Sequence, residues 1–214
     1  MSLVGDNFRA RMGPPDPAAA PGLRFETSEA SFWEMLHEEV GAGFYLDGFL
    51  YLFGEGLEPL LPALEAWSFL VPGLPKPMVL GYNAFGSLLV LLDRADVNSR
   101  VGVLDPSRVV WWEPGTIAFS NLLGAWLPGA RIPHFLDRAP YQAWRAAGGR
   151  RLRLGEMLSL KTPAALGGTF EPGNFEIADI GRYYEVSGPI YAKLTAKKGS
   201  AGAKRPRASR RRKR

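Results

Sequence analysis

MVLGYNAFGSLLVLLDRADVNSRVGVLDPSRVVWW, residues 78–112, contains four short apolar runs separated by turn residues. The runs span 78–81, 88–92, 101–104 and 109–112. Asn83 and Gly86 break the first pair, and a proline follows Asp105 in the third gap, where it favours a type I turn. The run 88–92 does not alternate, so we expect both of its faces to be covered. The stretch therefore predicts a meander of antiparallel strands.

Helical patterns lie on both sides of this meander. A helix capped by Thr27 or Ser28 is predicted to end at Val40, and a strand is predicted over 49–53. Further helices are predicted over 60–69, from Thr116 to the stop at Pro128, over 137–147, and over 177–194 with an interruption at Gly188-Pro189. The predicted fold class is α+β: a single domain with a central, mostly antiparallel sheet and helices packed on it.

The two ends of the chain differ from this body in composition. Residues 1–24 form a Pro/Ala-rich leader and residues 195–214 a Lys/Arg-rich tail, and both are predicted to be disordered, which leaves a domain at 25–194. Of the 26 Lys and Arg residues, ten lie in the tail, so 16 bases face 21 acids in the remainder, a net charge of −5. The chain is therefore an acidic domain with a basic tail.

The sequence lacks the residues that several kinds of functional site require. With no cysteine there is no disulfide, thiolate metal site or cysteine nucleophile, and no apolar run approaches a membrane span of roughly 18 residues. His37-Glu38 begins like a zinc-protease helix, but Gly41 stands where the second histidine belongs. His134 follows a proline without a neighbouring acid, so we expect a partly buried structural histidine. Gly81–Gly86 has glycine spacing but no phosphate-binding lysine. We expect a cytoplasmic protein without catalytic residues, cofactor or metal.

Five features then occur in a fixed order. An aromatic-glycine turn, NAFG at 83–86, precedes the turn VLDP at 103–106 and a helix containing Phe119, Leu122 and Leu123. Near the C-terminus stand PAALGG at 163–168 and NFEIAD at 174–179. In this order the features resemble the GAD-related domain family, over roughly residues 45–194. That family includes the C-terminal domain of immunity proteins that neutralise type VI secretion DNase effectors.

The resemblance implies a toxin-neutralising protein. The residues that this sequence shares with the family pattern, however, are of types that typically stabilise turns and cores. Glycines permit tight backbone geometry, an aspartate can order a turn, and a buried phenylalanine belongs to a core. The residues concerned are Asn83, Phe85, Gly86, Asp105, Gly167 and Gly168. The segment 128–153 is longer than the family pattern, and the basic tail is no part of that pattern.

Acidic residues in the first half of the chain are the predicted toxin contacts. Residues 1–93 hold 12 acids against four bases. An acidic surface can mimic DNA phosphates and occlude the basic cleft of a nuclease. The candidates are Glu34, Glu38, Glu39, Asp47, Glu55 and Glu58. The same pattern is also typical of a solvated surface that serves solubility alone.

The tail supports a different hypothesis, in which the protein associates with nucleic acid. Its charge density favours sequence-independent, salt-sensitive binding, and it contains no aromatic residue for base stacking. The candidate residues are Lys204, Arg205, Arg207, Arg210, Arg211, Arg212, Lys213 and Arg214. A tail that folds back on the acidic domain, a solubility role and a nuclear-import signal remain alternatives. The sequence leaves the oligomeric state open.

Overall fold

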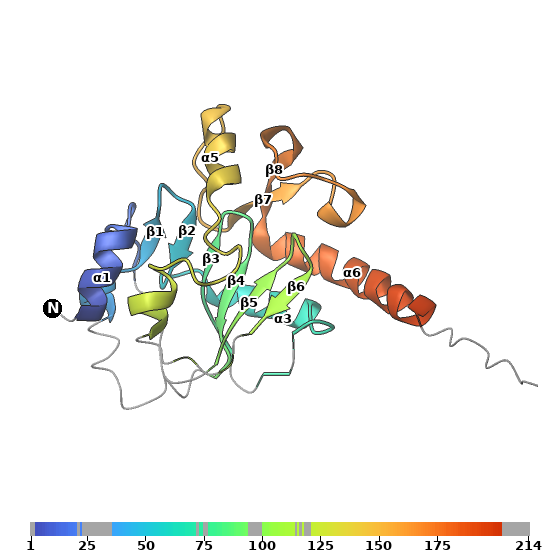
Figure 1. The fold of residues 1–214 in the computed structure, drawn as a ribbon, viewed down its shortest axis with the longest axis horizontal. Coiled ribbons are helices and arrows are strands. Elements are labelled where there is room, and N and C mark those ends of the chain that lie inside the picture. Colours follow the sequence, from blue (N-terminus) through green and yellow to red (C-terminus); the bar gives the residue numbers. More distant parts are fainter. Residues whose placement is uncertain are drawn as a thin grey trace, which may run out of the picture.

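The computed structural model describes residues 3–20, 22, 36–71, 73–74, 77–93, 100–113, 115, 117 and 121–202. A six-stranded antiparallel sheet forms its centre, and each strand pairs with its neighbour in the sequence, in the order β1 to β6 (Figure 1). The strands are β1 (Gly43–Tyr45), β2 (Leu50–Leu52), β3 (Met78–Asn83), β4 (Leu88–Leu91), β5 (Val101–Asp105) and β6 (Val110–Trp112).

The predicted meander is confirmed as β3 to β6. The four apolar runs and the observed strands agree to within two residues at each end, because turn residues close each run. Every residue of β4 is buried, as expected for a run that does not alternate. The predicted strand at 49–53 is β2, which pairs with both β1 and β3.

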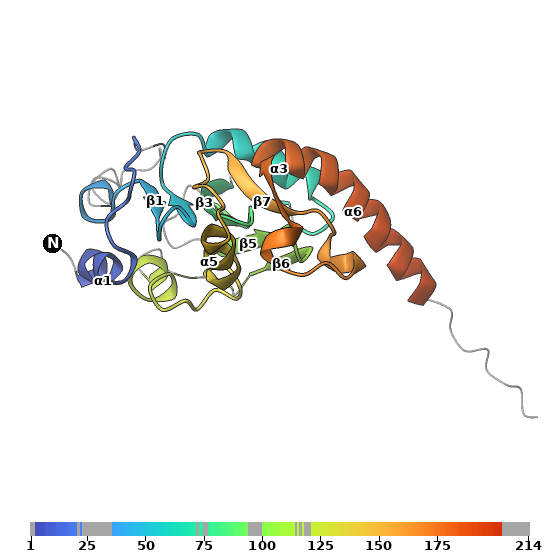
Figure 2. The same ribbon diagram turned by 90° about the horizontal axis from the view of Figure 1, so that it is seen from above.

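Helices cover both faces of the sheet. Figure 2 shows α3 (Leu61–Ala66) and α6 (Ile180–Gly202) along one side of the sheet, and α1 (Leu3–Met12) with the π-helical turn Leu122–Trp126 along the other. The indole of Trp67, just after α3, is fully buried and packs against the rings of Tyr184 and Tyr191 of α6. The confirmed class is α+β, with helices packed on a mostly antiparallel sheet.

A second, two-stranded sheet lies beside the first, and the sequence patterns missed it. It pairs β7 (Glu156–Leu160) with β8 (Phe175–Asp179). The amide of Leu158 donates to the carbonyl oxygen of Ala84 at 2.7 Å, which ties the small sheet to the β3–β4 turn. The predicted helix over 177–194 therefore starts as a strand, and α6 begins at Ile180.

The N-terminal segment differs from the predicted disordered leader. Residues 3–12 form α1, whose Phe8 and Met12 are buried in the core. The following segment to residue 20 is extended, as its prolines predict, but it runs along β1: the amide of Asp16 donates to the carbonyl of Phe44. Burial of these two side chains and main-chain hydrogen bonds along β1 thus contribute to offsetting the entropy of ordering a segment that composition placed outside the domain.

The other helix predictions have mixed outcomes. The helix predicted over 137–147 is confirmed as α5 (Ala139–Ala146), and that over 60–69 contains α3. Residues 23–35, 116 and 118–120 lie outside the described residues, so only the ends of two further predicted helices are described, as π-helical turns at Leu36–Val40 and Leu122–Trp126. The helix predicted to be interrupted at Gly188-Pro189 is continuous: α6 runs through Pro189 and past Leu194 to Gly202.

Candidate functional site

Asn83 organises the turn between β3 and β4 from inside the protein. Its side chain is 1% exposed, and its Oδ1 accepts hydrogen bonds from the amides of Phe85 and Ser87, both at 3.0 Å. Its Nδ2 donates to the carbonyl oxygen of Phe135 at 2.9 Å. Gly86 completes the turn with φ +76°, a conformation that favours glycine. Asn83 therefore holds two loops together and has no spare polar atom for a ligand.

Asp105 orders the turn between β5 and β6 in a similar way. Its Oδ1 accepts from the amides of Ser107 and Arg108 at 3.0 and 3.1 Å, and its Oδ2 pairs with the Arg108 guanidinium at 2.8 Å. That guanidinium also lies 4.4 Å from the ring centroid of Phe170, a cation–π contact. Both carboxylate oxygens of Asp105 therefore bind residues of their own turn.

Tyr184 of α6 joins the two turns. Its buried hydroxyl donates to the carbonyl oxygen of Gly86 at 2.8 Å and lies 3.4 Å from that of Leu104. Burial, with smaller contributions from Asp105 and Tyr183, raises the pKa of Tyr184 well above its ordinary value. The hydroxyl therefore stays protonated and acts as a structural donor.

The LGG element near the C-terminus forms a tightly held loop. Residues 164–166 make one 3-10 turn that ends at Gly167, with φ +88°. A methyl group on Gly168 would stand 1.8 Å from the carbonyl oxygen of Thr162, so glycine is required there. The side chain of Asn174 closes the loop with three hydrogen bonds, to Thr162 and Thr169.

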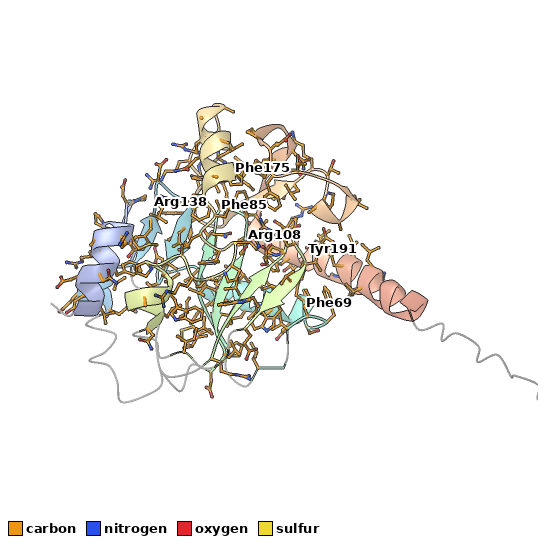
Figure 3. The ribbon with its side chains drawn as sticks, viewed as in Figure 1. Phe69, Phe85, Arg108, Arg138, Phe175 and Tyr191 are labelled. Atoms are coloured by element: carbon orange, nitrogen blue, oxygen red, sulfur yellow. The ribbon has the colours of Figure 1, made fainter. Side chains whose placement is uncertain are left out.

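Aromatic packing brings these motifs into one cluster. The ring of Phe85 lies 5.5 Å from the rings of both Phe170 and Phe175, and Figure 3 shows Phe85 and Phe175 side by side with Arg108 close by. The six motif residues predicted as structural thus meet, directly or through neighbours, where the β3–β4 and β5–β6 turns contact the small sheet and α6. The cluster therefore holds the two turns, the small sheet and α6 together.

The predicted acidic contacts do not form one surface. Glu38 and Glu39 precede β1 and Glu55 and Glu58 follow β2, so these four lie at the open end of the β1–β2 hairpin. Asp47 lies in the turn at the opposite end.

Two of these acids also contact residues from other parts of the chain. Asp47 lies 3.6 Å from the Nε of Arg145, and the Glu39 side chain lies against Gly5 of α1. Glu38, Glu55 and Glu58 are exposed, and within the described part of the chain no ion pair engages them. Glu34 and the eight tail candidates at 204–214 lie outside the described residues.

An arginine-rich segment was not singled out from the sequence. Residues 131–153 contain six arginines and one acid, Asp137. Arg151 reaches Asp16 at 3.5 Å, and Arg150 binds both carboxylate oxygens of Glu156 at 2.7 Å. This bidentate pair holds the pKa of Glu156 below its ordinary value. The charge count of the segment was the signal that could have identified it.

Two pockets lie along α6 and were also missed. One, of about 530 Å3, lies between α6, the β5–β6 turn and the LGG loop. The other, of about 460 Å3, lies between α6 and the small sheet. Their walls include exposed apolar side chains: Leu166, Val186, Ile190 and Leu194. The signal was the spacing of four between 186, 190 and 194, which places these residues on one helical face.

The described residues offer no metal site. No group of three or more His, Asp or Glu side chains within them could hold a metal ion. His134, expected to be partly buried, is exposed in a loop with φ +58°. No helix among the described residues is long and apolar enough to cross a membrane.

Comparison with known proteins supports the fold. No protein-family model matches the chain, and no curated protein matches it. The crystal structure of Atu4351 from Agrobacterium tumefaciens is similar, with a TM-score of 0.54 and 14% sequence identity over 86% of this chain and 87% of that chain. At this identity the likeness shows a shared fold alone.

Proposed function

We propose that this protein is a non-catalytic, cytoplasmic immunity protein, which binds a secreted nuclease toxin and blocks its DNA-binding cleft. The observation that carries the proposal is a charge asymmetry: residues 36–71 contain six acids and no Lys or Arg. Glu38, Glu55 and Glu58 within this segment are exposed. The order of the motifs that resemble the GAD-related family supports the same function.

The physical basis is electrostatic mimicry. A nuclease that grips DNA must present cations to the phosphates, so an acidic partner is drawn to the same cleft and accelerates its own association. Unpaired, exposed carboxylates contribute most to this effect, because a carboxylate that already faces an arginine has a weaker field. Among the described residues no ion pair engages Glu55 or Glu58, so both meet that condition, whereas Asp47, beside Arg145, does not.

Capture followed by inhibition tests the proposal. Full-length protein is used as bait in nuclease-treated lysate of its native cells, and a captured protein is purified and assayed on supercoiled plasmid. We expect that it cuts the plasmid and that one equivalent of this protein abolishes cutting. A captured protein without nuclease activity, or a nuclease that keeps its activity in the complex, contradicts the proposal.

A charge-matched pair of variants then tests the surface. We expect Glu55→Lys/Glu58→Lys to lower the association rate by about tenfold or more at low salt, since steering contributes 10- to 1,000-fold. Asp137→Lys/Glu171→Lys changes the net charge equally, but at exposed acids outside the segment, and should retain most of the rate. Equal rates for the two variants would remove residues 55–58 from the contact.

A second candidate function is nucleic-acid association, and the arginine-rich segment 131–153 favours it. Arg131 and Arg138 are exposed there and make no ion pair within the described residues. Together with the basic tail they could neutralise several phosphates. We expect binding of a fluorescent DNA duplex to weaken linearly with salt on a double-logarithmic plot. Arg131→Gln/Arg138→Gln should then reduce the slope by about two, and an unchanged slope would exclude these arginines.

A further inference from the structure

An apolar stripe runs along the exposed face of α6. Val186, Ile190 and Leu194 are 58%, 53% and 46% exposed. Their spacing of four places them on one side of the helix, whereas Tyr184 and Tyr191 on the other side are buried against Trp67. A stripe of large apolar side chains on an ordered helix is typical of an interaction surface.

The stripe borders two pockets along α6, and we name the two together the groove. The 460 Å3 pocket lies beside Val186 and Ile190, and the 530 Å3 pocket lies beside Leu194. The helical residues that line them run from 182 to 195, about 20 Å at 1.5 Å per residue. Such a length suits the apolar face of another helix.

The far wall of the groove is rigid. Leu166 is 75% exposed and lines the larger pocket, although it sits on the loop that Asn174 closes with three hydrogen bonds. Gly168 fixes the same loop by its close approach to Thr162. A loop held in this way presents Leu166 with little conformational entropy left to lose, which favours binding.

We propose that the groove is filled by α6 of a second copy of this chain, so that the protein is a homodimer with its two α6 helices antiparallel. The stripe is palindromic about Ile190, with one apolar residue four positions before it and one four positions after it. A two-fold axis at Ile190 therefore places Val186 opposite the partner subunit's Leu194. Both copies use the same surface, as two-fold dimers require.

The charges along the helix favour the antiparallel arrangement. The end of β8 and the first turns of α6, residues 176–185, hold three acids and one base: Glu176, Asp179, Arg182 and Glu185. Lys193 lies further along α6, and the sequence beyond Thr195, which includes the end of this helix, carries ten bases and no acid. Antiparallel pairing sets the basic end of each copy over the acidic end of its partner. Parallel pairing would set like charges together.

Light scattering of the full-length protein, without any toxin, tests the dimer. We expect a mass of twice the 23.5 kDa chain. Ile190→Glu should return it to a single chain mass, because the substitution puts two carboxylates at the two-fold axis. Leu154→Glu is the matched control, at a 45% exposed leucine away from α6, and should remain dimeric. A monomer at all concentrations, or a dimer that survives Ile190→Glu, overturns the proposal.

Cysteine cross-linking tests the orientation, since the natural chain has no cysteine. Under mild oxidation, we expect Ile190→Cys to form a disulfide-linked dimer. Val186→Cys alone should not, because two copies of that position lie about 12 Å apart along the axis in the antiparallel pair. A mixture of Val186→Cys and Leu194→Cys should give the mixed dimer. Efficient cross-linking of Val186→Cys by itself would overturn the antiparallel arrangement, and no cross-linking of Ile190→Cys would overturn the dimer.

Discussion

Replacing Asn83 by alanine should cost this protein a large part of its stability. The substitution removes three hydrogen bonds and leaves the amides of Phe85 and Ser87 and the carbonyl of Phe135 without partners. A buried polar group left unsatisfied costs about 1–3 kcal/mol. The low end of that range, for three groups, lowers the free energy of unfolding by about 3 kcal/mol. For a chain of this size, that loss corresponds to a melting temperature about 6–12 °C lower.

Asn174→Ala is the matched control, because Asn174 also makes three side-chain hydrogen bonds with main-chain atoms. Its bonds are exposed to solvent, so water replaces them, and we expect a loss of about 1 kcal/mol or less. Urea unfolding followed by tryptophan fluorescence measures both variants. Equal losses in the free energy of unfolding would refute the reasoning, since burial of the Asn83 hydrogen bonds would then make no difference to stability. An Asn83→Ala loss below about 1 kcal/mol would refute it as well.

Three further predictions concern the same cluster and its border. Tyr184→Phe leaves the carbonyl of Gly86 unsatisfied and should lower the free energy of unfolding by about 1–2 kcal/mol in urea titrations. Gly168→Ala places a methyl 1.8 Å from a carbonyl oxygen and should lower the melting temperature measurably, at a cost of about 1–3 kcal/mol. The pKa of Glu156 is lowered by Arg150, so its contribution is present above the ordinary pKa of 4.5 and is lost as pH falls through the folded value. Stability should therefore drop less steeply below about pH 4.5 in Glu156→Gln than in the natural chain.

Much of the sheet was predictable, because the strands of the meander are apolar runs closed by residues with strong turn preferences. β7 and β8 were not, because both mix polar with apolar side chains, for example EMLSL at 156–160. The predicted break at Gly188-Pro189 failed for a tertiary reason. Gly188 packs directly on the carbonyl of Ala66, so the contact of α6 with α3 holds the helix through the proline.

The structural role of the motif residues was also predictable, since turn-forming asparagine, aspartate and glycine act through local bonds. The grouping of charges was not. Asp47 and Glu55 are only eight residues apart in sequence, yet Asp47 lies in the β1–β2 turn and Glu55 lies beyond the opposite end of β2. The partner of Asp47 is Arg145, far along the chain, and sequence spacing gives no information on such a pair.

The sequential strand order has a consequence for how the chain folds. Because each of the six strands pairs with the next one along the chain, the sheet can grow hairpin by hairpin as the polypeptide leaves the ribosome, with little loop-closure entropy at each step. Tyr184, which links the carbonyls of two hairpin turns, emerges after all of them. The C-terminal helix is thus the last piece to dock, and a ribosome stalled before residue 180 would hold a complete sheet whose turns are not yet joined.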